Sequence, residues 1–224
     1  MLTSTVATLH DNSTHGEDSY LVRTLDNNAL LDAVMDGVTG RKGREASRAL
    51  ADALATAVLT SPDDVVAVLE TMNQKLYQRG WGRFWLTTVS AVLFLGDTLH
   101  VIGVGDSPVF LLRSDSCQAL FCHVSGLLHA GVARALGARQ TLGSLYHTAV
   151  TVAPGDRVVL ATDGVTDNMT RPELVDIVRH AASPNTAAEQ LHTLLTTRHQ
   201  QGQWRGDFRR DDWTAIIRFF SLAG

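Results

Sequence analysis

Apolar residues recur along the chain with two different spacings. Between residues 44 and 59, and again between 62 and 80, they recur every three or four positions, as on one face of a helix. The same spacing predicts a helix after Thr170, and another that follows Ser183-Pro184 and runs through Leu195. The remaining apolar runs have the length of strands, which we expect at residues 3–9, 19–25, 29–35, 86–95, 98–104, 108–112, 118–122, 147–152, 156–162 and 212–219.

Two of the predicted helices begin with a clear N-terminal signal. Ser61 offers a cap, Pro62 fits the first turn, and acidic residues follow at once. Thr170 and Glu173 have the spacing of a capping box. The connections between 59 and 62 and between 181 and 184 are short, so each pair of neighbouring helices is expected to be antiparallel.

The order of these elements predicts the fold class. Strands occur in clusters linked by tight turns, such as Gly96-Asp97 and Pro154-Gly155, and helices occur in pairs. This order favours an α+β fold of two packed antiparallel sheets with a helix pair on each outer face, rather than alternating βαβ units. Residues 1–224 are expected to form one domain. Residues 113–147, which are rich in glycine and lack clear periodicity, are expected to form a surface excursion or flap.

Short acidic motifs lie next to several predicted strands. They are Glu17-Asp18, Asp36-Gly37, Gly105-Asp106, Asp163-Gly164 and Asp211-Asp212. Strand ends are rigid, so carboxylates there can meet in space although they are distant in sequence. Clustered carboxylates raise one another's pKa unless a cation neutralises them. Oxygen ligands without Cys or His suit Mg²⁺ or Mn²⁺ better than zinc. The sequence therefore predicts a carboxylate-lined site for divalent metal ions.

Composition limits the class of protein further. The chain has 224 residues, 45% of them hydrophobic, which is enough for one full core. Its net charge of −4 gives no reason to expect binding to nucleic acid or to an anionic membrane. Cys117 and Cys122 do not make a disulfide framework, and neither a secretory signal nor a membrane span is visible. We expect a cytoplasmic, monomeric protein.

Taken in order, the acidic motifs resemble those of the metal-dependent protein phosphatase family (the protein phosphatase 2C type), in its bacterial form. The resemblance covers nearly the whole chain and includes residues 36–47, Thr87-Thr88, Gly105-Asp106-Ser107, residues 162–167 and residues 211–214. It implies an αββα four-layer sandwich with a two-metal site at one edge. It also implies the hydrolysis of phosphoserine and phosphothreonine in a protein substrate, such as a kinase or the target of a kinase.

The resemblance also assigns roles to individual residues. Asp36 resembles the carboxylate that bridges two Mn²⁺ or Mg²⁺ ions, with the Gly37 carbonyl beside it. Asp163 and Asp211 resemble the other direct ligands. Two further roles follow from the same resemblance: Asp106 as ligand of a third, weaker metal, and Glu17 and Asp18 as groups that reach metal-bound water.

The expected mechanism agrees with the physical chemistry of such a site. Two metal ions about 3.5–4 Å apart lower the pKa of a bridging water and make it a nucleophile. They also neutralise charge on the phosphoryl oxygens. No Cys or Ser nucleophile is then required, and the sequence lacks a Cys-x5-Arg phosphate loop.

The chain departs from the family pattern where the substrate phosphate would be held. Many family members have an arginine at the position of Ser13, and His15 is the nearest group here that can become cationic. Arg41, which follows the Asp36-Gly37 turn, is the candidate replacement. Four other basic residues could also contact the phosphate, namely Lys42, Arg44, Arg209 and Arg210. The other interpretation of these residues is that they only balance local charge.

Two further alternatives stay open. Trp81, Phe84 and Trp85 are expected to fill the core, with a peptide-binding surface as the second interpretation. The second alternative concerns function, because a catalytically weak relative could use the fold as a binding or regulatory module. Its support is the missing arginine at Ser13, whereas the retained Asp36, Asp163 and Asp211 favour the enzyme.

Overall fold

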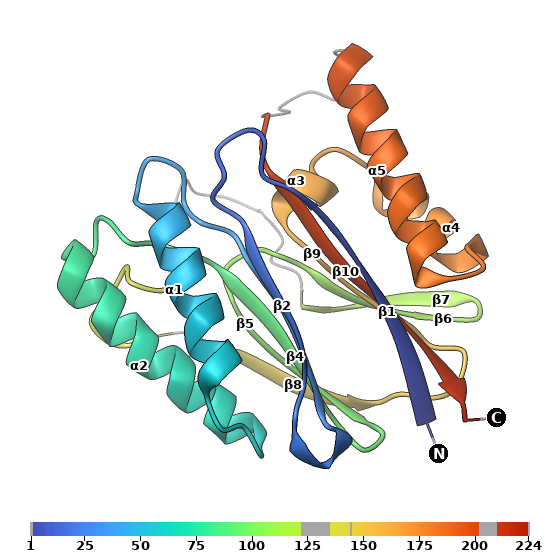
Figure 1. Cartoon of the computed structure of the whole chain (residues 1–224), viewed down its shortest axis with the longest axis horizontal. Helices are drawn as coiled ribbons and strands as arrows, with labels where there is room; N and C mark the ends of the chain where they lie inside the picture. The colour runs from blue at the N-terminus through green and yellow to red at the C-terminus, as the bar shows by residue number, and fades with distance from the viewer. Residues whose placement is uncertain (1, 122–134, 144, 202–209, 224) are drawn as a thin grey trace.

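Two five-stranded antiparallel sheets form the centre of the computed structural model, which describes residues 2–121, 135–143, 145–201 and 210–223 (Figure 1). One sheet has the order β1-β10-β9-β6-β7 and the other β2-β3-β4-β5-β8. The strands are β1 (Leu2–Asp11), β2 (Ser19–Thr24), β3 (Leu30–Met35), β4 (Val89–Leu95), β5 (Thr98–Val104), β6 (Val109–Arg113), β7 (Ser116–Phe121), β8 (Tyr146–Thr151), β9 (Arg157–Ala161) and β10 (Trp213–Leu222). All ten predicted strands are present; β5 has the expected ends, and the others differ at one end or both.

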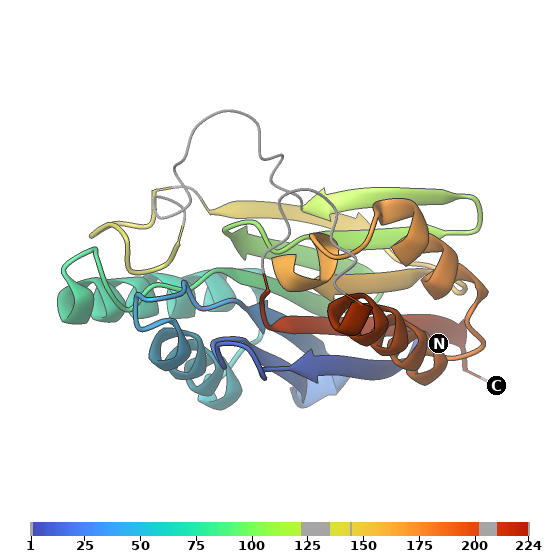
Figure 2. The ribbon, with the colours of Figure 1, turned by 90° about the horizontal axis from the view of Figure 1, so that it is seen from above.

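Helix pairs cover the two outer faces, as the sequence predicts. On one side lie α1 (Gly43–Thr56) and α2 (Pro62–Gly80), and on the other α4 (Arg171–His180) and α5 (Pro184–Gln201) (Figure 2). The predicted N-cap at Ser61 and the predicted capping box of Thr170 and Glu173 are confirmed, and Ser61 also forms a capping box with Asp64. The 3-10 turn η1 (Asp26–Asn28) and the short helix α3 (Asp163–Thr166) were not expected.

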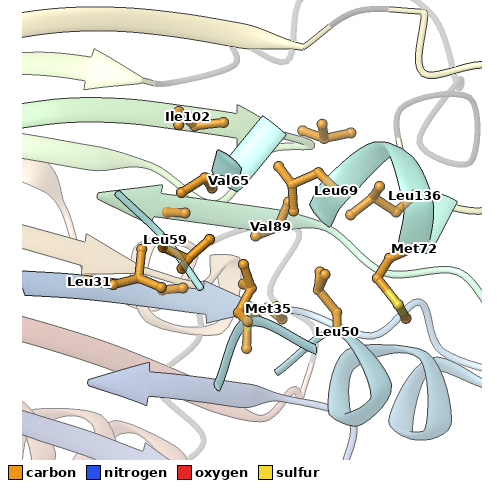
Figure 3. Packing of buried hydrophobic residues seen from close by; sticks show 14 of the residues in the cluster. Leu31, Met35, Leu50, Leu59, Val65, Leu69, Met72, Val89, Ile102 and Leu136 are labelled. Carbon is orange, nitrogen blue, oxygen red and sulfur yellow. The ribbon is translucent and has the colours of Figure 1, made fainter. Parts of the chain in front are cut away.

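Three layers of apolar side chains hold these four layers together. Figure 3 shows the first, in which Leu31 and Met35 of β3 meet Leu50 of α1 and Leu69 of α2. A second layer, with Leu160 and Ile216, lies between the sheets, and a third lies beneath α4 and α5. Strand residues alternate between layers because successive side chains point to opposite faces. The αββα sandwich is therefore confirmed.

A bidentate ion pair joins the two sheets within the middle layer. Arg218 of β10 donates to both carboxylate oxygens of Asp32 on β3, at 2.6 and 2.7 Å. The remaining guanidinium nitrogen of Arg218, Nη1, donates to the Ser4 hydroxyl at 2.8 Å. Asp32 is fully buried and Arg218 is 3% exposed. Sequence reasoning did not find this pair, because nothing local links residues so far apart in the chain.

Two expectations about less regular segments need correction. Within the segment expected to be a surface excursion, Ala135 and Leu136 are buried and Leu136 pairs with Thr87, whereas residues 139–141 are exposed as expected. The expectation of a flap stays a prediction for residues 122–134 and 144, which lie outside the described residues. The prediction that the aromatic run fills the core is wrong for Trp81 and Phe84, which are 81% and 48% exposed. No helix of the described residues is long and apolar enough to cross a membrane.

Candidate metal centre

The loops that carry the predicted acidic residues lie at one edge of the sandwich, next to the ends of strands from both sheets (Figure 1). Asp36 follows the end of β3, while Asp106 and Asp163 come two residues after β5 and β9. Asp18 and Asp211 instead precede β2 and β10. Neighbouring strands are antiparallel, so the start of one lies beside the end of the next. The topology thus brings both kinds of strand end to one edge.

The carboxylates at this edge are close enough to change one another's ionisation. Removal from solvent raises the pKa of Asp36 well above its ordinary value, and the charges of Asp163, Asp18, Asp211 and Asp106 raise it further. Burial likewise raises the pKa of Asp163 to about 7, with Asp106 and Asp211 acting in the same direction. For Asp211 the pKa is also raised, chiefly by burial. Such a cluster favours a cation that neutralises several carboxylates at once.

The donor set fits Mn²⁺ or Mg²⁺. The five aspartates of the cluster offer oxygen, the ligand atom that these hard cations prefer. They are Asp18, Asp36, Asp106, Asp163 and Asp211. Within the described part of the chain, Asp163 Oδ1 and Glu17 Oε2 are enclosed and have no hydrogen-bond partner. The described part of the chain contains no group of three Asp, Glu, His or Cys side chains that is already arranged to hold an ion. Oxygens left without a donor, in a cluster of like charge, are what a bound cation would satisfy.

The Thr87-Thr88 segment, which directly precedes β4, holds the backbone of Asp36. The N–H of Thr88 and the hydroxyl of Thr87 donate to the Asp36 carbonyl at 2.7 and 2.9 Å. In return the Asp36 N–H donates to Thr88 Oγ1, which lies 3.1 Å from the hydroxyl of Ser107. The Thr87-Thr88 motif therefore positions Asp36 and links it to the turn that carries Asp106.

Two glycine contacts allow the acidic loops to approach one another. Gly37 packs directly on Gly43, and a Cβ atom added to Gly37 would lie 2.4 Å from the Gly43 carbonyl carbon. A Cβ atom on Gly164 would lie 1.8 Å from the backbone oxygen of Asp212. Any larger residue at either position would push the Asp36 loop, or the Asp163 and Asp211 loops, apart.

Asp212 is a site residue that sequence reasoning missed. Its Oδ1 accepts hydrogen bonds from the N–H groups of Thr14 and His15 at 3.0 and 2.9 Å, and its Oδ2 accepts one from Glu17 at 2.8 Å. Asp212 therefore ties the loop that carries Glu17 and Asp18 to the start of β10. The doubled acid Asp211-Asp212 was the only signal in the sequence, and it does not reveal which backbone groups are bound.

Asp18 is more buried than the other carboxylates of the cluster and is held by two threonines. Its Oδ2 accepts from the hydroxyls of Thr162 and Thr214 at 2.9 and 2.7 Å. Burial raises the pKa of Asp18 to about 7 against the opposing effect of these hydrogen bonds. This position fits the expected indirect role, in which Asp18 acts on water or on the ligands.

The two candidate phosphate contacts lie in different surroundings. His15 is exposed and close enough to Asp211 to oppose the rise that burial causes in the pKa of that carboxyl. Arg41 is turned toward the loop after α2, where its guanidinium donates to the Arg83 carbonyl at 3.3 Å and lies 5.9 Å from the Phe84 ring. Arg44 donates to the carbonyls of His15 and Gly16 and so supports that loop.

Of the other predicted cations, Arg210 donates to His199 Nε2. Lys42 pairs with Glu45 at 3.1 Å. The contact of Lys42 balances charge locally, and the contact of Arg210 is a local hydrogen bond to a neutral ring nitrogen. Arg209 lies outside the described residues.

A cavity of about 370 Å³ opens beside the acidic cluster. Asp106 and Asp163 form one side of it, and the apolar side chains Phe110, Met169 and Leu174 form its floor. The cavity gives a substrate group room next to the carboxylates that the sequence predicts to bind metal.

Comparison with solved structures identifies the fold as that of protein phosphatases of the 2C type. PppA, a key regulatory component of the T6SS in Pseudomonas aeruginosa, superposes with a TM-score of 0.79 and 24% identity over 97% of each chain. The catalytic domain of the serine/threonine protein phosphatase PstP, in complex with two manganese ions, gives a TM-score of 0.79 and 21% identity. That superposition covers 99% of this chain and 100% of the PstP chain.

The sequence comparison identifies the family. The profile described as Stage II sporulation protein E (SpoIIE) matches residues 23–218, so the chain belongs to that family. The chain is also 26% identical over 223 residues to the probable protein phosphatase 2C 55 of Arabidopsis thaliana. The aligned region covers 93% of this chain but only 46% of the plant protein, so the chain spans about half the length of this relative.

Proposed function

We propose that the protein is a Mn²⁺- or Mg²⁺-dependent phosphatase that hydrolyses phosphoserine and phosphothreonine in a protein substrate. The observation that carries this proposal is the convergence of Asp36, Asp163, Asp211 and Asp106 at one edge, with the pKa of Asp36 raised by burial and by the charges of the other three. The family and the fold support the same activity.

In this proposal two metal ions are held by Asp36, the Gly37 carbonyl, Asp163 and Asp211, and a third by Asp106. Bound there, the ions would supply an activated water nucleophile and neutralise the phosphoryl oxygens. Glu17 and Asp18 orient water around the ligands. Asp212 is a positioning residue, because it holds the backbone of the loop that carries both acids.

The substrate phosphate also needs a group with positive charge from the protein. His15 is the better-placed candidate, because it already interacts with Asp211 at the cluster. Arg41 reaches the phosphate only if it leaves the Arg83 carbonyl and the Phe84 ring. We therefore expect His15→Ala to raise KM for a phosphopeptide more than Arg41→Ala does.

Hydrolysis of a phosphoserine peptide tests the proposal. The wild-type protein should release phosphate with added Mn²⁺ and lose that activity in EDTA. Asp36→Asn should lower the Mn²⁺-dependent rate by at least about 10²-fold, the scale on which one charge-stabilising group acts. Its circular dichroism spectrum should match the wild type. A wild-type protein that is inactive with both metals, or an Asp36→Asn protein with full activity, contradicts the proposal.

The second candidate function is a catalytically weak binding or regulatory module. The observation in its favour is that Ser13 occupies the position where many family members have the phosphate-binding arginine. This candidate predicts that Mn²⁺ binds with no measurable hydrolysis of phosphopeptide, so the same assay combined with calorimetry separates the two.

A further inference from the structure

The loop that follows α2 exposes large aromatic side chains beside the candidate metal centre. Trp81 is 81% exposed and Phe84 48% exposed, and Trp85 lies partly buried below them. We refer to Trp81, Phe84 and Trp85 as the aromatic loop. Tryptophan and phenylalanine stabilise a fold by burial, so side chains left this open contribute little to the core. Contiguous exposed apolar surface is typical of a binding site.

The aromatic loop is held in an uncommon backbone conformation. Trp81 and Trp85 have φ angles of 52° and 60°, in the left-handed region that bulky residues rarely adopt. The N–H of Trp81 donates to the Tyr77 carbonyl at 2.6 Å, and the N–H of Phe84 donates to the Gly80 carbonyl at 3.1 Å. Such strain persists where the surrounding structure fixes it, and it often marks a functional segment.

Backbone hydrogen bonds join the aromatic loop to the segment that carries Asp36. The N–H of Trp85 donates to the Arg41 carbonyl at 2.6 Å, and the N–H of Val38 donates to the Leu86 carbonyl at 3.0 Å. Gly37 and Thr87 also form a β-bridge. A ligand on the aromatic loop therefore lies beside the turn that begins with Asp36 and Gly37.

Three arginines lie in or next to the aromatic loop. The guanidinium of Arg79 lies 4.9 Å from the Trp85 ring centroid and that of Arg41 lies 5.9 Å from the Phe84 ring centroid. Arg83 lies within the loop and is exposed. The chain as a whole carries a net charge of −4, so this grouping of cations is a local departure from its overall charge. Arginine on an aromatic face suits a ligand with carboxylates and apolar side chains.

We propose that the aromatic loop, together with Arg79 and Arg83, docks an acidic segment of the phosphoprotein substrate next to its phosphorylated residue. This inference rests on the proposed function, since it assigns the sequence around the phosphorylated residue that the same site selects. Trp81 packs on the segment, and the two arginines bind its carboxylates. Docking lowers KM for substrates with acidic flanks and leaves small phosphate esters unaffected.

The test compares two labelled phosphoserine peptides, one with glutamates beside the phosphoserine and one with alanines in their place. Fluorescence anisotropy in EDTA measures binding without hydrolysis. The wild type should bind the glutamate peptide more tightly, and Trp81→Ala and Arg83→Ala should each weaken that binding about fivefold or more. The binding should also weaken with added salt. With Mn²⁺, KM for the same peptide should rise in both variants while turnover of p-nitrophenyl phosphate stays unchanged.

Val58→Ala is the matched control. Val58 is 82% exposed and follows α1, at the opposite end of the α1–α2 pair from the aromatic loop (Figure 1). This control should bind both peptides like the wild type.

Three outcomes overturn the inference. The first is unchanged binding of the glutamate peptide in Trp81→Ala, and the second is an equal loss of that binding in Val58→Ala. The third is binding of a single-stranded oligonucleotide that depends on Trp81 and is tighter than binding of the glutamate peptide. Failure of the proposed function is seen separately, as Trp81-dependent peptide binding by a wild-type protein that does not hydrolyse the peptide with Mn²⁺.

Discussion

Asp32, within β3, and Asp36, directly after it, are close in sequence but differ in burial and in their charged neighbours. Asp32 lies within β3, fully buried between the sheets, and both of its oxygens accept from Arg218. Asp36 lies just past the end of the strand, and its electrostatic neighbours are the carboxylates of Asp163, Asp18, Asp211 and Asp106. Asp32 has its cation inside the protein, whereas the charges that act most strongly on Asp36 among the described residues are those of other carboxylates.

This difference separates a structural charge from a functional one. Burial raises the pKa of Asp32 and Arg218 opposes that effect in part, so the pair links the sheets without any outside partner. The Asp36 cluster holds like charges that the fold keeps together at a cost, through Gly37, Gly164, and the hydroxyls of Thr87 and Thr88. A cluster of this kind is stable only with an external cation or with some of its carboxyls protonated.

The largest effect is expected from breaking the paired charge. Asp32→Asn leaves the buried Arg218 guanidinium without a counter-charge and should lower the free energy of unfolding by about 3–5 kcal/mol. Urea unfolding followed by circular dichroism measures this loss. The double variant Asp32→Leu/Arg218→Met removes both charges and should recover most of the stability. A double variant less stable than Asp32→Asn would show that the pair is not the cause.

A smaller effect is expected from supplying the cation that the cluster lacks. Mn²⁺ at about a hundredfold excess over its dissociation constant should stabilise the folded protein by about 2.7 kcal/mol. Thermal unfolding with Mn²⁺ and with EDTA gives the difference. Asp106→Ala should keep most of this stabilisation while turnover falls, because Asp106 is assigned to the third metal only. Loss of all Mn²⁺-induced stabilisation in Asp106→Ala would contradict this division of roles.

The remaining predictions concern the metal-free protein, and the first of them is its pH dependence. The pKa of Asp18 and of Asp163 is raised from 3.8 to about 7, so the unfolded chain loses these protons at lower pH than the folded protein does. In EDTA, stability should therefore fall as the pH rises from about 5 to 7, and Mn²⁺ should remove this trend.

The same substitution at the other aspartate provides the matched comparison. Asp36→Asn removes one like charge and should stabilise the metal-free protein at pH 8 by about 1 kcal/mol, opposite in sign to Asp32→Asn. Thermal unfolding in EDTA measures it. A destabilised Asp36→Asn protein would show that Asp36 is paired in a way that the cluster does not reveal.

Local patterns in the sequence predicted most of the elements. The four long helices follow from apolar spacing, and two of their starts follow from the N-cap at Ser61 and the capping box at Thr170. The predictions were poorer where contacts between distant segments decide the structure. The strand expected from residue 86 begins at Val89, because Thr87 pairs with Gly37 and Leu136 instead. Apolar character alone suggested burial for Trp81 and Phe84, although they lie on the surface.

The sequence by itself determined the αββα architecture and which acidic residues lie at strand ends, because both depend on periodicity and on short motifs. Only the tertiary structure decided which polar groups meet. The hydrogen bonds of Asp212 to the loop of Glu17, the threonines that hold Asp18 and the pairing of Asp32 with Arg218 all join residues far apart in the chain. Charge and hydrogen bonding act over a few ångströms of space, and residues become neighbours at that scale only when the two sheets pack.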